Sequence, residues 1–132
     1  MTLKNILFFV CLSFFSTVFA ANIHTYPNAT ETKGQASYPR FCEIEIINHS
    51  WHDVRVWGVF DDGTALQPFT VYGYDAAHYI SLFYYGYCHD GMDLYISILR
   101  SGYPVYSGYT PNATTMYILP GNMPSAELKN KA

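Results

Sequence analysis

The stretch MDLYISI, residues 92–98, decides the fold class of this chain. Apolar and more polar side chains alternate along it, in the order Met92, Asp93, Leu94, Tyr95, Ile96, Ser97 and Ile98. Successive side chains of a β-strand point to opposite faces, so this alternation predicts a strand with one buried and one exposed face. A helix would repeat its apolar positions every three or four residues, and no window of the sequence shows that stripe convincingly.

The same two-residue period recurs on both sides of this stretch. It covers residues 42–46, 54–60, 78–85, 103–109 and 114–119. Asp61-Asp62-Gly63 is a hairpin signal, and the segment that returns from it contains Pro68, which is typical of an edge strand or a break. About seven short strands separated by turns predict an all-β fold, a small antiparallel β-sandwich of immunoglobulin-like or jelly-roll-like type.

The amino terminus has the layout of a secretory signal peptide. Lys4 precedes an apolar run over residues 6–19, and Ala20 provides a small residue before the expected cleavage site. The run is shorter than the roughly 20 apolar residues that cross a bilayer. We therefore expect residues 1–20 to be removed and the mature chain to be secreted or periplasmic, with no transmembrane segment.

The remaining chain divides into three parts. Residues 21–40 mix proline, glycine and polar residues without periodicity, which predicts a flexible leader. Residues 41–120 form the predicted sandwich domain. Residues 121–132 follow Pro120 and are mostly polar, so we expect a disordered tail.

Two cysteines, Cys42 and Cys88, remain once the signal peptide is removed. An even pair in an exported chain predicts a disulfide, because the compartment is oxidising. Cys42 shares its strand register with Ile44, and Cys88 shares that of Ile80. Both sulfur atoms are therefore expected to face the interior, as a bridge across the core requires.

Disulfide-bonded sandwiches of the immunoglobulin type offer a loose resemblance. Those domains carry a tryptophan between their two cysteines, as this chain does at Trp51 and Trp57. They also carry a tyrosine two residues before the second cysteine, where this chain has Gly86. The resemblance concerns the fold alone, since one fold hosts many unrelated functions.

Composition and motifs argue against several functions. Only 13% of the residues are charged and the net charge is −3, which excludes a basic footprint for nucleic acid. Nucleophile elbows, zinc-protease helices, phosphate loops and dinucleotide fingerprints are missing from the sequence. Ser50, His52 and Asp53 have the residue types of a catalytic triad, but they are neighbours in one turn and need not form a relay. Glu43 and Glu45 share one strand face and could act as paired carboxylates, but a solvated outer face is the simpler interpretation. We expect a non-enzymatic protein without a cofactor, and a small secreted enzyme is the alternative.

Histidines in turns support a second alternative, a metal-binding protein. His49 and His52 lie in one turn, and His89 follows Cys88. The three could hold zinc or copper if the two turns meet at one end of the sandwich. The simpler interpretation is that these are polar turn residues facing water. His78 points to the same strand face as the apolar Ile80, so we expect it to belong to the core.

Aromatic residues give the richest functional signal, with thirteen tyrosines and two tryptophans. The alternation of their strands places Trp57, Tyr79 and Tyr95 on outward-pointing positions, and Trp51 lies in a turn. Such side chains combine a wide apolar face with a polar tip, so they populate surfaces that stack on sugars or dock proteins. We predict a ligand-binding face built from these four residues, on an exported module for carbohydrate or for a partner or host protein. Packing inside the sandwich is the alternative role.

Three Asn-x-Ser/Thr sequons occur, at Asn28, Asn48 and Asn112. In a eukaryotic secretory pathway such sequons mark surface positions for glycans. In a bacterial chain they indicate only polar turns.

Overall fold

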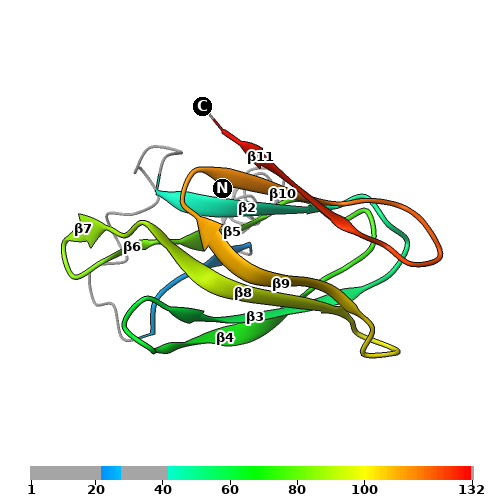
Figure 1. The fold of residues 1–132 in the computed structure, drawn as a ribbon, viewed down its shortest axis with the longest axis horizontal. Coiled ribbons are helices and arrows are strands. Elements are labelled where there is room, and N and C mark those ends of the chain that lie inside the picture. The colour runs from blue at the N-terminus through cyan, green and yellow to red at the C-terminus, as the bar shows by residue number, and fades with distance from the viewer. Residues whose placement is uncertain (1–21, 28–41, 132) are drawn as a thin grey trace, which may run out of the picture.

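The structure is a computed structural model that describes residues 22–27 and 42–131, and these residues form eleven strands (Figure 1). Residues 1–20, predicted as a signal peptide, and most of the predicted leader lie outside the described residues. The described part of the chain contains no helix long and apolar enough to cross a bilayer.

Two large sheets and a small hairpin make up the fold. The five-stranded sheet has the order β1 (Ile23–His24), β5 (His78–Ser81), β2 (Glu43–Asn48), β10 (Thr114–Ile118) and β11 (Ala126–Asn130). The four-stranded sheet has the order β4 (Ala65–Val71), β3 (Val54–Phe60), β8 (Gly91–Ile98) and β9 (Pro104–Pro111). The hairpin consists of β6 (Phe83–Tyr84) and β7 (Tyr87–Cys88).

A single core joins the two large sheets. Met92, Leu94, Ile96 and Ile98 of β8 are buried and Asp93 is exposed, as the alternation predicted. Both sheets contribute fully buried side chains to one cluster, among them Ile44, Ile46, Ile80, Met116 and Ile118 from the first and Val54, Val56, Leu94 and Ile96 from the second. Each such side chain contributes roughly 1.5–3 kcal/mol to folding. The predicted all-β, sandwich-like fold is confirmed.

The five-stranded sheet is mixed, which the prediction of an antiparallel sandwich did not include. β10 pairs with β2 in parallel, with Thr114 opposite Ile44, and β1 pairs with β5 in parallel, with Ile23 opposite Tyr79. Alternation along a strand reports which side chains share a face. It carries no information on the direction of the neighbouring strand.

Pro68 lies on β4, an edge strand of the four-stranded sheet, as its presence predicted. The pairing of β3 with β4 shifts register between Val56 and Gly58. Because proline has no N–H for the ladder, an edge strand with an irregularity is where a sheet tolerates it.

Both ends of the domain contain more structure than the sequence predicted. Residues 126–130 form β11 along β10 instead of a disordered tail, and Lys131 beyond it places its Nζ 2.9 Å from Glu43 Oε1. In the predicted leader, β1 pairs with β5, and Tyr26 beside it is buried. These strands are short or largely exposed, so they lack the alternation that reveals a half-buried strand.

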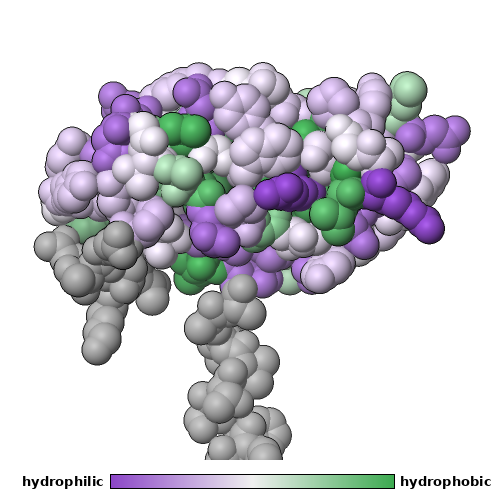
Figure 2. Space-filling model, turned by 90° about the horizontal axis from the view of Figure 1, so that it is seen from below, coloured by the Kyte–Doolittle hydropathy of each residue, from purple (hydrophilic) through white to green (hydrophobic). Residues whose placement is uncertain are grey.

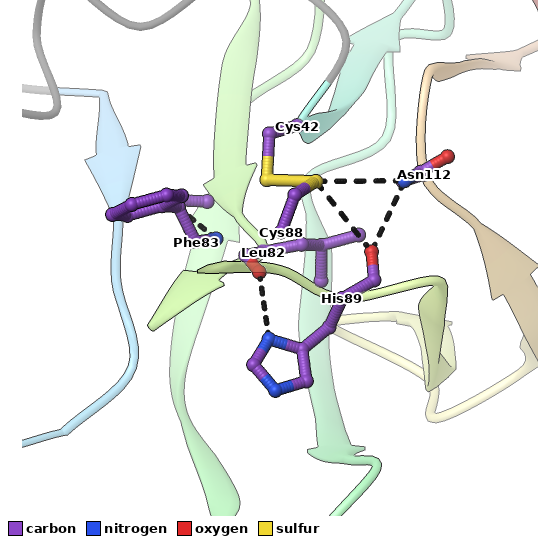
Figure 3. The surroundings of a disulfide bond; sticks show 7 residues. Cys42, Leu82, Phe83, Cys88, His89 and Asn112 are labelled. Atoms are coloured by element: carbon purple, nitrogen blue, oxygen red, sulfur yellow. Dashed lines mark hydrogen bonds between the residues drawn. A yellow bond between two sulfur atoms is a disulfide. The ribbon is translucent and has the colours of Figure 1, made fainter. Parts of the chain in front are cut away.

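The predicted disulfide is present, with the Cα atoms of Cys42 and Cys88 5.7 Å apart (Figure 3). It connects the residue before β2 to β7, at the end of the sandwich where the β6–β7 hairpin lies (Figure 1). We call this the disulfide end, and the opposite end, with residues 49–53 and 99–103, the loop end. The bridge therefore ties a hairpin to β2, whereas we had expected it to join two sheets across the core. The reason is the hairpin turn at Tyr85 and Gly86, which have φ values of 54° and 79° and reverse the chain just before Cys88.

Candidate ligand-binding surfaces

The four aromatic residues predicted to form one face are distributed over three surfaces. Trp57 and Tyr95 lie on β3 and β8 of the four-stranded sheet, whereas Tyr79 lies on β5 of the other sheet. Trp51 belongs to the loop between β2 and β3, at the loop end. The prediction of a single face is wrong, because outward parity does not tell to which sheet a strand belongs.

Trp57 and Tyr95 form an aromatic pair on the outer face of the four-stranded sheet. They are directly opposite each other on neighbouring strands, with ring centroids 5.8 Å apart and planes within 20°. Both are half-buried, and the guanidinium carbon of Arg55 lies 5.6 Å from the Trp57 ring centroid. We call Arg55, Trp57 and Tyr95 the Trp57 platform.

Polar side chains surround this platform. Ser97 pairs with Arg55 across the strands, and Ser107 of β9 pairs with Tyr95. Exposed Asp93 lies two residues along β8 from Tyr95, on the same face. Figure 2 views the molecule from below, the side on which β4 lies in Figure 1, and shows small hydrophobic patches interspersed with hydrophilic residues. The platform is thus an aromatic surface with hydrogen-bonding groups beside it.

Tyr79 belongs to a charged network on the five-stranded sheet. Lys131 Nζ lies 5.4 Å from its ring centroid, and Glu45 is its cross-strand neighbour. Thr115 Oγ1 donates to Glu45 Oε1 at 2.9 Å, and Lys131 reaches Glu43. Tyr79 is half-buried within this network, so its contacts favour a structural role over the predicted role in binding.

The loop that carries Trp51 is fixed by a buried asparagine. Asn48 Nδ2 donates to the carbonyls of His52 and Val71, at 2.7 and 3.2 Å. Asn48 Oδ1 accepts from the N–H and the hydroxyl of Ser50, at 2.9 and 2.7 Å. Both Asn48 and Ser50 are completely buried, whereas Trp51 between them and β3 is 58% exposed. A rigid loop therefore presents a largely solvent-accessible indole.

A pocket of about 510 Å³ adjoins this indole. It is formed where the β2–β3 loop meets the β8–β9 turn. A hydrogen bond joins the two segments, because the N–H of Leu99 donates to the carbonyl of Asp53 at 2.9 Å. The lining residues are Trp51, His52, Asp53, Ile98, Leu99 and Arg100. We call it the loop-end pocket.

The triad residue types in this loop do not form a catalytic relay. The Ser50 hydroxyl donates to Asn48 Oδ1, and Asp53 Oδ1 accepts from the N–H of Gly73 at 2.9 Å. His52 Nε2 is buried and has no hydrogen-bond partner within the described residues. The side chains of Ser50, His52 and Asp53 therefore form no hydrogen bonds with one another in the described chain.

The histidines proposed as metal ligands lie at opposite ends of the sandwich. His49 and His52 are at the loop end, whereas His89 follows the disulfide. Its Nδ1 lies 3.2 Å from the Leu82 carbonyl oxygen (Figure 3). The His89 ring also stacks on that of Tyr84, with centroids 3.5 Å apart. Residues 22–27 and 42–131 contain no group of three or more histidine, cysteine or acidic side chains that could hold a metal. The metal-site hypothesis for these histidines is wrong.

Another histidine pair was missed by sequence reasoning. His24 Nε2 lies 2.9 Å from His78 Nδ1, and His78 Nε2 lies 3.4 Å from Asp75 Oδ2. The His24 ring stacks on Phe69 with centroids 3.4 Å apart. Burial, with a smaller contribution from the charge of His78, lowers the pKa of His24 to about 4. His78 is buried as predicted, but His24 falls in the segment predicted to be flexible, so no pattern pointed to the pair.

Tyrosines gather at the disulfide end. The Tyr26 hydroxyl donates to Asp62 Oδ2 at 2.5 Å and lies 2.9 Å from the hydroxyl of Tyr85. The first contact raises the pKa of Tyr26 and lowers that of Asp62, because it stabilises the protonated phenol and the ionised carboxylate together. Tyr85 and Tyr87 are 68% and 58% exposed. This end therefore combines exposed phenol rings with acidic side chains.

Two of the three sequons are engaged inside the fold. Asn48 is completely buried with its amide in use, so a glycan there is incompatible with this structure. Asn112 is partly buried, and its Nδ2 donates to the carbonyl of His89 at 3.1 Å (Figure 3). The predicted surface role is therefore wrong for Asn48, and Asn28 lies outside the described residues.

Comparison of the chain with models of protein families, with curated proteins and with solved structures finds no match.

Proposed function

We propose that this chain is an exported, non-enzymatic module that binds carbohydrate through the Trp57 platform. The observation that carries the proposal is the pair of near-parallel rings of Trp57 and Tyr95, side by side on an outer sheet face. Aromatic faces of this kind stack on the C–H face of a sugar ring. Arg55, Ser97 and Ser107 lie beside the rings and can bond hydroxyl groups.

Export is supported by the signal-peptide layout of residues 1–20 and by the Cys42–Cys88 disulfide, which forms and persists in oxidising compartments. Carbohydrate is favoured because the two rings of the platform are half-buried and have the exposed Arg55 and Asp93 beside them. Small aromatic areas framed by polar groups suit a ligand that is itself amphipathic.

A partner protein is the second candidate, favoured by the disulfide end. Tyr85, Tyr87 and Tyr109 are each more than half exposed there. Exposed tyrosine is enriched at protein interfaces, since it offers apolar area and a hydroxyl. Loss of partner capture in Tyr87→Ala, with capture intact in Trp57→Ala, would favour this candidate.

Glycan-array binding of the disulfide-bonded chain tests the proposal, with Trp57→Ala and Tyr95→Ala as variants. Removing an anchor is expected to weaken binding by roughly 2 kcal/mol, about thirtyfold in Kd. Tyr103→Ala, in the β8–β9 turn outside the platform, is the matched control and should bind as the original chain does. Urea unfolding of each variant separates lost binding from lost stability. Normal binding by folded Trp57→Ala and Tyr95→Ala proteins would refute the platform.

A further inference from the structure

We infer that the loop-end pocket is a binding site for a sugar that carries a carboxylate, such as a uronic acid. The inference extends the proposed function to a second, chemically different site. The pocket and the Trp57 platform share no residue, and the two sites can be tested separately.

The backbone around the pocket is fixed before any ligand arrives. Asn48 and Ser50 hold the loop from inside, and the N–H of Leu99 bonds the carbonyl of Asp53. Gly73 packs so closely under this loop that a Cβ atom there would lie 2.8 Å from the Ser50 carbonyl oxygen and from the Trp51 carbonyl carbon. A preorganised site loses less conformational entropy on binding than a mobile one, which makes small ligands easier to hold.

Arg100 supplies the group that recognises a carboxylate. It is exposed at the start of the β8–β9 turn, and no carboxylate of the described residues lies within 4.0 Å of its guanidinium. Its planar fork is free to form two parallel hydrogen bonds with a carboxylate, an arrangement that selects for that geometry. Among residues 22–27 and 42–131, the pocket thus contains a cation without an ion-pair partner.

Asp53 supplies the group that suits hydroxyls. His52 lines the pocket beside it, but its Nε2 is buried from solvent and has no hydrogen-bond partner in the described chain. Asp53 uses Oδ1 for the N–H of Gly73 and lines the pocket as an acceptor. Because Asp53 repels a second carboxylate, the acid group of a ligand is directed toward Arg100 and its hydroxyls toward Asp53.

Trp51 and Leu99 supply the apolar wall. They are 58% and 49% exposed, and the rings of Trp51 and His52 lie 5.3 Å apart at 43°, which forms an aromatic corner. A saturated ring can place its C–H face against this corner while its polar substituents reach the charged groups. The volume of about 510 Å³ falls within the roughly 300–1,000 Å³ typical of small-molecule sites. A carboxylate, hydroxyls and an apolar ring face together describe a sugar acid.

The two tryptophans of the sequence allow a direct test, because each candidate site contains one of them. In a ¹⁵N-correlated NMR spectrum of the disulfide-bonded chain, their two indole N–H signals can be assigned with Trp51→Phe and Trp57→Phe. Titration with glucuronate should shift the Trp51 signal and leave the Trp57 signal in place. Glucose, which lacks the carboxylate, should bind at least about tenfold more weakly.

Arg100→Gln should weaken glucuronate binding about tenfold, to the level of glucose, without changing glucose binding. Lys129→Gln removes a cation from β11, outside both candidate sites, and should leave glucuronate binding unchanged. Dispersed backbone signals in each spectrum verify that the variant is folded.

Three results would overturn the inference. They are a Trp51 signal that glucuronate does not move, equal affinity for glucose and glucuronate, and benzoate binding as tightly as glucuronate. A neutral oligosaccharide that fails to move the Trp57 signal counts against the platform and leaves the pocket untouched.

Discussion

Asn48 shows how one buried polar side chain shapes a functional surface. Its amide forms four hydrogen bonds to the loop and to β4, so the loop can expose Trp51 without becoming mobile. The sequence identified Asn48 only as a turn residue and a sequon. Which turn asparagine is buried depends on the strands packed around it, here β4 at Val71, and local pattern does not contain that information.

We expect Asn48→Ala to lower the free energy of unfolding by about 3 kcal/mol, because two buried carbonyls and the Ser50 hydroxyl lose their partner. A shift of the urea midpoint measures the effect. Asn122→Ala makes the same substitution at an exposed position and should change stability by less than about 0.5 kcal/mol. Equal midpoints for the two variants would show that the Asn48 network contributes little.

At the scale of the elements, β1 carries a histidine that should make stability depend on pH. His24 of β1 has a pKa of about 4 in the fold against 6.5 for the free side chain, so the unfolded chain binds its proton more tightly. The stabilisation is complete above pH 6.5 and is lost as the pH falls from about 6.5 to about 4. Since His24 is partly solvated, the loss is on the order of 1 kcal/mol.

Urea unfolding between pH 7 and pH 4 tests this expectation. His24→Gln should flatten the decline in stability over this range, whereas His49→Gln, at an exposed histidine, should follow the original chain. Identical pH profiles for His24→Gln and the original chain would contradict it.

Prediction of the elements succeeded where a strand has one buried face. β2, β3 and β8 alternate buried and more exposed side chains along most of their length, and the sequence shows the same period. β1 has two residues, and β11 has four exposed side chains out of five. Such strands are held by backbone hydrogen bonds, which any sequence can form, so their residues carry little signal.

Across the whole molecule, the Cys42–Cys88 bridge closes a segment with a sequence separation of 46. Chain entropy predicts that its loss lowers the free energy of unfolding by up to about 4 kcal/mol. Cys42→Ser, Cys88→Ser and the double variant should lose the same amount in urea unfolding, since each lacks the bridge. A double variant much less stable than either single would indicate that the side chains, and not the bridge, provide the stabilisation.

Whole-molecule topology also limited the prediction of the site. The alternation along the strands correctly placed Trp57 and Tyr95 on an outer face. The pairing of β3 with β8 brings these two side chains together. Tyr79 lies on another surface because β5 belongs to the other sheet. The pocket needs residues 51–53 and 98–100, which are distant in sequence and meet through the end of one sheet. Contacts of this kind become visible once the strand order is known.

The parallel pairing of β2 with β10 has a consequence for how the chain acquires its fold. β2 lies between β5 and β10, so the residues that complete its ladders follow it by more than thirty and about seventy positions, as Ile44 with Ile80 and with Thr114 shows. Such distant pairings make folding slow, typically milliseconds to seconds, because a long loop must close before its contacts form. While the chain is being synthesised, one edge of β2 can pair once β5 has emerged, whereas its other edge remains unpaired until β10 has passed. The five-stranded sheet can therefore be completed only after β10 has arrived, whereas Cys42 and Cys88 both precede β8 and are available to each other earlier.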